Sequence, residues 1–175
     1  MYEYGLPMNI NMGSIGSVIG HEVTHAFDTT GSQFDEEGNL RDWWTEETKK
    51  RFEKKASCFV DEYGGIYDYR VNTQLNGNTS QGENIADNGG IRQAYFAQRN
   101  YFRRLNKTGA VLMGLKNVTS DQLFFISVAM VWCTNTRKEM LTRQIKYDEH
   151  CPAKYRYHEF AYTPAIQSNS VQFPS

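Results

Sequence analysis

The chain has 175 residues, enough for one folded domain, since single domains usually contain about 100 to 200 residues. Its 19 Lys and Arg residues balance 20 Asp and Glu residues, and this near-neutrality excludes the global positive field that holds nucleic acid or anionic membranes. An aromatic content of 14% excludes a disordered polar tail. The longest strongly apolar run, 123–133, is much shorter than the roughly 20 residues of a membrane-spanning helix. We therefore expect a soluble folded unit that contacts neither nucleic acid nor, by itself, a membrane.

The first predicted element is a helix over residues 14–28 with Ser14 as its N-cap. Its apolar residues recur near the 3.6-residue helical period. They are Ile15, Val18, Ile19, Val23 and Phe27. Such a stripe is typical of a helix face that packs into a core.

The next predicted elements are a turn and a second helix. Residues 31–39 contain the run Asp-Glu-Glu-Gly-Asn, which predicts a loop or hairpin. The second helix is expected to begin after Trp44, because Thr45 precedes two glutamates that suit the positive end of a helix dipole. We expect its apolar side to point inward, with Phe52, Ala56, Phe59 and Val60.

Four further segments complete the predicted order. They are a short strand within 66–71, a helix over 83–105, a helix over 121–138 capped by Ser120, and irregular structure after Asp148. The sequence therefore predicts a mainly α fold with little β structure.

His21, Glu22 and His25 form an HExxH motif inside the first predicted helix. Positions i and i+4 of a helix face the same way, so both imidazoles can reach one Zn²⁺ while Glu22 lies beside the metal. Asp28 follows on the same stripe and can accept the imidazole N–H that points away from the metal. The pattern predicts a zinc site; two solvated surface histidines flanking a glutamate are the alternative.

A catalytic zinc site needs a third protein ligand and one open position for water. No histidine follows His25 closely, so the best candidate is Glu83, at the start of the predicted helix 83–105. Asp87 is four residues further on the same helical face, so one carboxylate can bind the metal while the other orients a histidine. An ExxxD pair alone usually means solvated charge, but its occurrence with an HExxH motif favours a metal site.

Three N-glycosylation triplets lie in stretches that are predicted to be loops. They begin at Asn78, Asn106 and Asn117. The three cysteines Cys58, Cys133 and Cys151 are an odd number without CxxC spacing, so neither a self-contained disulfide framework nor a cysteine zinc site is expected. Together these features favour an exported glycoprotein whose remaining parts carry the partner thiols.

With these motifs in view, the chain resembles the neprilysin and endothelin-converting-enzyme family of zinc metallopeptidases along nearly all of its length. The matching stretches are VIGHEVTHAFD at 18–28, DWWT at 42–45, GENIADNGG at 82–90, QLFF at 122–125 and VWC at 131–133. GENIADNGG is far more specific than HExxH alone. The resemblance implies a zincin-like catalytic lobe fragment built on the HExxH helix and the ExxxD helix.

The resemblance also implies a role for each matching side chain. It makes His21, His25 and Glu83 the ligands of one Zn²⁺, Glu22 the general base, and Asp28 and Asp87 the partners of the histidines. His150 matches a histidine that donates a hydrogen bond to the oxyanion, and Arg156 matches an arginine that grips a substrate carbonyl. Val18, Val131 and Trp132 match positions that line the pocket for the residue after the scissile bond. From sequence pattern alone, His150 would be a surface histidine and these three would be ordinary helix core.

The chain departs from the family pattern in length and at its end. Family ectodomains are much longer and two-lobed, so residues 1–175 would be one partial domain, with 157–175 a divergent tail and the N-terminal lobe of the parent absent. Cys58 and Cys133 match family cysteines whose partners lie in the missing parts. Cys151 stands where serine is usual, so it is expected to be a thiol exposed to oxidation.

The function implied is that of a zinc-dependent metalloendopeptidase that cuts short peptides on the amino side of hydrophobic residues. It would work outside the cell, in a secreted protein or in the ectodomain of a membrane-anchored one. The alternative is a truncated paralogue that binds zinc or peptide without cleaving it. A plain helical structural domain is a third alternative, which would make every motif match an accident.

Overall fold

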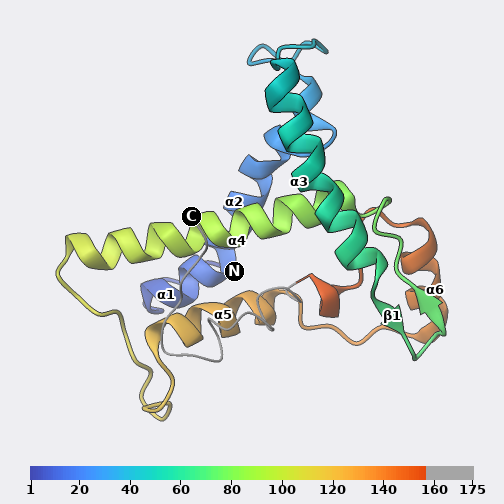
Figure 1. The fold of residues 1–175 in the computed structure, drawn as a ribbon. Coiled ribbons are helices and arrows are strands. Elements are labelled where there is room, and N and C mark those ends of the chain that lie inside the picture. The colour runs from blue at the N-terminus through green and yellow to red at the C-terminus, as the bar shows by residue number, and fades with distance from the viewer. Residues whose placement is uncertain (157–175) are drawn as a thin grey trace.

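The structure is a computed structural model that describes residues 1–156. These residues are mainly helical, as predicted, and a short two-stranded hairpin is the one sheet among them. In Figure 1 the long helix α4, Gln81–Arg104, runs through the middle, with α2 above it and α5 below it in this view. No helix within the described part of the chain is long and apolar enough to cross a membrane. The predicted divergent tail, 157–175, lies outside the described residues.

The helix that carries HExxH begins earlier than predicted. Helical structure starts with α1 at Met8–Asn11 after Pro7, continues through a π-helical segment and α2 at Ser17–Thr24, and ends in a 3₁₀ turn at Phe27. The prediction of Ser14 as N-cap was wrong. Its hydroxyl is buried inside the helical run and donates to backbone carbonyls, among them that of Ile10 four residues earlier. Pro7 sets the actual start, because its fixed φ suits the chain entering a helix.

Small residues make the contact between α2 and α4. An added Cβ at Gly20 would lie 2.6 Å from the carbonyl oxygen of Gly90, and one at Gly90 would lie 2.3 Å from the backbone nitrogen of His21. A residue larger than glycine at either position would push the helices apart. The crossing therefore holds the HExxH motif directly against α4.

The apolar stripe of the HExxH helix points away from this crossing. The side chains of Ile19, Val23 and Phe27 are each more than half exposed, whereas Gly20 and Thr24 are buried. The expectation that the stripe packs into a core was therefore wrong for these three residues. The reason is that the backbones of the HExxH helix and α4 can meet only on the face of the HExxH helix that carries glycine and other small residues.

The main core forms where α4 meets α5, Ser120–Val131. It consists of Ile91, Ala94, Tyr95, Phe124, Phe125 and Val128, with Met12 packed against it. Thr119, not Ser120, caps α5: its hydroxyl accepts from the N–H of Gln122, whose side chain accepts from the N–H of Thr119. This capping box supplies partners for two groups at the start of the helix.

The helix predicted over 121–138 is shorter than expected, and a separate helix follows it. It ends at Val131, where the apolar run gives way to polar residues, and α6 follows at Lys138–Tyr147. No element was predicted for residues 139–147, so α6 was missed. Leu141 and Ile145 are its buried residues, and their spacing of four is the signal that would have indicated it.

The second helix was predicted correctly. It is α3, Glu46–Gly64, and the hydroxyl of its cap Thr45 accepts a hydrogen bond from the N–H of Thr48. The predicted loop over 31–39 contains a 3₁₀ turn and closes through a β-bridge between Phe34 and Leu40.

A hairpin and a second core lie at the far end of α3. Strand β1, Tyr67–Asp68, pairs antiparallel with β2, Thr73–Gln74. The second core joins α3, the hairpin, α6 and the segment after it. It contains Tyr63, Leu75, Leu141, Ile145, Cys151 and Tyr155. A 3₁₀ turn at Ala153–Tyr155 leads from this core to Arg156.

Cys151 belongs to this second core and is 4% exposed, so the expectation of an oxidisable thiol was wrong. Burial raises the pKa of the Cys151 thiol to about 12, and the nearby carboxylate of Asp87 adds to the increase. Cys58 and Cys133 are exposed free thiols. All three predicted glycosylation asparagines are exposed in loops or turns, namely Asn78, Asn106 and Asn117.

Candidate metal centre

The crossing of α2 and α4 brings together three metal-binding side chains. His21 and His25 project from adjacent turns of the HExxH helix, and Glu83 projects from the first turn of α4. The two Nε2 atoms are 2.9 Å apart. Each lies 3.4 Å from an oxygen of Glu83.

These separations suit a shared cation. A tetrahedral zinc with bonds of about 2.1 Å holds its ligand atoms about 3.4 Å apart. Two imidazoles and one carboxylate are also a common ligand set of catalytic zinc, with the fourth position left open. The donor set and spacing at His21, His25 and Glu83 therefore fit one Zn²⁺.

A carboxylate lies behind each of the two imidazoles. Asp28 Oδ2 is 2.6 Å from Nδ1 of His25, and its other oxygen accepts from the N–H groups of Thr30 and Gly31 at 2.7 Å. Gly31 is needed here, because an added Cβ would lie 1.8 Å from the carbonyl oxygen of His25. A carboxylate held this firmly fixes the orientation of a ligand imidazole.

Asp87 takes the corresponding place behind His21. Its Oδ1 lies 2.9 Å from Nδ1 of His21, although the two groups lack the alignment of a full hydrogen bond. Arg156 holds Asp87 through two hydrogen bonds of 2.6 and 2.8 Å and reaches Glu83 at 3.3 Å. The guanidinium of Arg156 therefore links Glu83, a candidate ligand, with Asp87, the carboxylate behind His21.

The acidic surroundings change the protonation of this region. Burial lowers the pKa of His25, but the hydrogen bond with Asp28 and the charges of Glu83 and Glu22 outweigh it, and the net pKa is raised. Burial likewise disfavours the charge of Arg156, but its pKa is raised because Asp87 stabilises the cation. In the absence of metal, the site therefore favours positive charge, as a cation site should.

His150 joins this cluster from the segment that follows α6. Its Nε2 lies 3.1 Å from Glu83 Oε2, and its Nδ1 lies 3.0 Å from Asp148 Oδ1. The hydrogen bonds from His150 are also the main reason why the pKa of Asp148 is lowered. The structure thus places His150 beside a candidate ligand, where sequence pattern alone would have left it on the surface.

The residues matched to a substrate pocket are only partly brought together. The guanidinium of Arg156 lies 3.8 Å from the ring centroid of Trp132, so these two form one unit. Val18 and Val131 are half-buried on α2 and at the end of α5. Glu22 is exposed on the HExxH helix between the two histidines.

Two acidic residues that border the cluster were not predicted from the sequence. Asp148 holds the imidazole of His150, and Glu149 has a carboxylate oxygen within 4.8 Å of donor atoms of Glu83 and His150. The only signal for them is their position directly before His150. That position means little until the fold brings the segment to α4.

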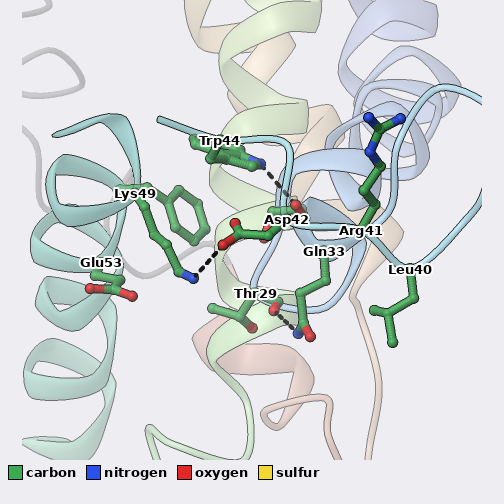
Figure 2. A pocket seen from close by; sticks show the side chains of 10 residues that line it. Thr29, Gln33, Leu40, Arg41, Asp42, Trp44, Lys49 and Glu53 are labelled. Carbon is green, nitrogen blue, oxygen red and sulfur yellow. Dashed lines mark hydrogen bonds and ion pairs between the residues drawn. The ribbon is translucent and has the colours of Figure 1, made fainter. Parts of the chain in front are cut away.

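A separate cavity of about 500 Å³ lies between the loop after the HExxH helix and the start of α3 (Figure 2). The indole of Trp44 borders it and donates to the carbonyl of Ser32 at 2.8 Å, while Lys49 and Asp42 approach to 3.7 Å. None of the candidate ligands lines this cavity. The metal cluster is instead open to solvent through His25 and His150, whose side chains are 30% and 40% exposed.

Comparisons with known proteins show which family the chain matches. The family model described as peptidase family M13 matches residues 1–168. Neprilysin-1 of Trittame loki is 44% identical over 97% of this chain and 23% of its own length, and Membrane metallo-endopeptidase-like 1 of Mus musculus is 46% identical over 86% and 20%. The chain thus spans about a fifth of the length of these curated relatives.

Solved structures show the same fold. The zinc metalloprotease ZMP1 of Mycobacterium tuberculosis, in complex with an inhibitor, superimposes with a TM-score of 0.81 at 27% identity, covering 94% of this chain and 27% of that one. PEPO of Lactobacillus rhamnosis gives a TM-score of 0.73 at 30% identity, covering 93% and 25%. The HExxH helix, the Glu83 helix and these matches together identify the chain as a member of peptidase family M13, the neprilysin and endothelin-converting-enzyme family of zinc metallopeptidases.

Proposed function

We propose that this chain carries the catalytic centre of a zinc-dependent endopeptidase, with His21, His25 and Glu83 as ligands of one Zn²⁺. The observation that carries the proposal is the mutual spacing of 2.9 to 3.4 Å among these three donors on two crossing helices. A bound zinc ion lowers the pKa of its water to about 7 and polarises a peptide carbonyl.

Glu22 is the general base of the proposed reaction. Its carboxylate is exposed next to His21 in the sequence and acts electrostatically on His25, which suits a base on the open side of the site. It accepts a proton from the attacking water and delivers that proton to the leaving amine.

His150 stabilises the negative charge that develops on the scissile carbonyl oxygen. Asp148 Oδ1 lies at Nδ1 of His150, so Nε2 is on the side that faces the metal cluster, where an N–H can be donated to the oxyanion. A hydrogen-bond donor positioned in this way stabilises the transition state most, because the negative charge on the oxygen develops there.

The proposed substrates are short peptides cut on the amino side of hydrophobic residues. Arg156 is anchored by Asp87 and stacked on Trp132, so its guanidinium is held in one direction and suits a substrate carbonyl. Val18 and Val131, both half-buried, would complete an apolar pocket with Trp132.

The test is cleavage of a quenched fluorogenic peptide by the chain with one equivalent of zinc. Glu22→Gln should lower turnover by roughly 10² to 10⁴-fold, the usual contribution of a general base, while zinc content stays at one per chain. Glu36→Gln, a change of the same charge at an exposed loop position, should leave turnover unaltered. Unchanged cleavage in Glu22→Gln, or wild-type cleavage that survives a chelator, would overturn the proposal.

A catalytically incompetent zinc-binding or peptide-binding paralogue is the second candidate. The exposed apolar face of the HExxH helix supports a binding role, because Ile19, Val23 and Phe27 are each more than half exposed. Zinc at one per chain without chelator-sensitive cleavage would favour this candidate.

We also propose that this face packs against the rest of a longer parent protein, including its N-terminal lobe, since relatives are about five times as long as the matched region. Three exposed glycosylation asparagines and the exposed thiols Cys58 and Cys133 suit an extracellular protein with disulfides to those missing parts. Ile19→Asp should abolish binding of this chain to the remainder of the parent. Undiminished binding would refute the proposed contact.

A further inference from the structure

A second group of potential metal ligands lies next to the first. Glu83, Glu149 and His150 each place one donor atom within 4.8 Å of the other two. The closest pair is His150 Nε2 and Glu83 Oε2, at 3.1 Å. One imidazole and two carboxylates are ligands that zinc accepts.

The far side of His150 resembles that of a metal-binding histidine. Ligand imidazoles usually donate the N–H that points away from the metal to a carboxylate or carbonyl. Asp148 Oδ1 lies 3.0 Å from Nδ1 of His150 and also accepts from the backbone N–H of the same residue at 2.8 Å. A proton held at Nδ1 in neutral His150 leaves a lone pair at Nε2, directed toward Glu83.

The charges of this region also favour a second dication. Six carboxylates lie in, beside or directly behind the two ligand groups. They are Glu22, Asp28, Glu83, Asp87, Asp148 and Glu149. Among the described residues, Arg156 is the cationic side chain in contact with them. One Zn²⁺ and Arg156 balance three of the six charges when all are ionised, so a negative excess of three remains.

Glu83 can serve both groups, because its carboxylate lies close to the histidines of both. Oε1 lies 3.4 Å from His25, whereas Oε2 lies 3.1 Å from His150 and 3.4 Å from His21. Two metal ions about 3.5 to 4 Å apart are common in hydrolases, where charged ligands offset the repulsion between them.

We propose that Glu83, Glu149 and His150 form a second zinc site, weaker than the first, whose occupation inhibits the enzyme. A zinc ion on Nε2 of His150 removes the N–H that this imidazole would donate to the oxyanion. The inhibition therefore rests on the proposed function, whereas the binding of a second zinc does not. The site makes the peptidase sensitive to free zinc above the concentration that fills the first site.

The experiment titrates Zn²⁺ into the chain already loaded with one equivalent, and follows bound zinc with a competing dye and cleavage with a fluorogenic peptide. The wild type should bind two zinc ions in two phases. Filling the second phase should lower turnover by roughly 10² to 10³-fold, the usual loss when an oxyanion donor is removed.

The decisive variant is Glu149→Gln, which keeps the three ligands of the first site and the proposed catalytic residues. It should retain basal turnover while the second phase and the inhibition move to zinc concentrations at least about 10-fold higher, since even an outer partner of a metal site contributes about 10- to 100-fold to affinity. Glu36→Gln should retain both wild-type phases. Inhibition and second-phase binding that are identical in Glu149→Gln and wild type would overturn the proposal, and so would a single binding phase in the wild type. Two phases without any peptidase activity would support the second site while refuting the proposed function.

Discussion

The contact between α2 and α4 at Gly90 is the most direct structural test of how the metal site is built. A Cβ at position 90 would lie 2.3 Å from the backbone nitrogen of His21 and 2.7 Å from the carbonyl oxygen of Ser17. Both are backbone atoms, so no side-chain rotation can relieve the clash. The helices would have to separate by about 1 Å to restore an ordinary contact of about 3.4 Å.

Two opposing effects set the magnitude for Gly90→Ala. Alanine is better than glycine in a helix by about 1 kcal/mol, whereas overpacking a close contact usually costs about 1 to 3 kcal/mol. Because the clash is with backbone on both sides, we expect the upper part of that range and a net loss of roughly 1 to 2 kcal/mol. A shift of about 1 Å would also move His21 away from Glu83, which are 3.4 Å apart, so zinc affinity should fall by at least about 10-fold.

The assay is urea denaturation with chelator present, together with a zinc competition titration. Gly64→Ala is the matched control, because Gly64 ends α3 and its added Cβ would meet nothing closer than 3.9 Å. That variant should keep or slightly increase stability and bind zinc normally. If Gly90→Ala is as stable as wild type and binds zinc as tightly, the close crossing does not set the geometry of the ligands.

Two other predictions concern the second core. Asp68 is fully buried and, despite a burial effect that would raise its pKa, hydrogen bonds from Arg70 and Tyr155 hold the pKa below the ordinary 3.8. The contribution of the Asp68 carboxylate to stability is therefore complete above pH 3.8 and is lost as the pH falls through its lowered pKa in the folded state. Asp68→Asn should lower the free energy of unfolding by roughly 1 to 3 kcal/mol at pH 7, as measured by urea denaturation. The difference in unfolding free energy between the variant and wild type should shrink in acid. A constant difference down to pH 2 would contradict this. Cys151, buried with a pKa of about 12, should resist alkylation at pH 8 while the two exposed cysteines react, and mass spectrometry that finds all three equally modified in the native chain would refute its burial.

Much of the candidate site could be predicted because its chemistry is local in sequence. His21 and His25 are four residues apart on a helix, and the same spacing relates Glu83 to Asp87, so each pair shares a face whatever the tertiary structure. The cap of α3 at Thr45 was predictable for the same reason, since capping depends on the next three residues. The resemblance to the neprilysin family, which the family model and the relatives confirm, added His150 and Arg156 as expectations.

Other features depended on contacts that no local pattern encodes. The apolar stripe of the HExxH helix predicted a buried face, but α4 takes the glycine face instead, because only there can the two backbones meet. Cys151 has no local signal for burial; it lies in the core because α6 and the hairpin close around it. Glu149 acquires a metal-binding partner only when the segment after α6 returns to Glu83.

The sequence by itself determined one domain-sized, nearly neutral, mainly helical unit with a zinc-binding motif and a carboxylate as the candidate third ligand. Composition and helical periodicity suffice for that, since they depend on residues a few positions apart. Only the tertiary structure decided that the HExxH helix and α4 cross backbone to backbone at the site, and that His150 and Arg156 reach Glu83. It also decided that the apolar face of the HExxH helix remains exposed. The first two of these features join residues more than 60 positions apart in sequence, and their geometry follows from how the helices pack.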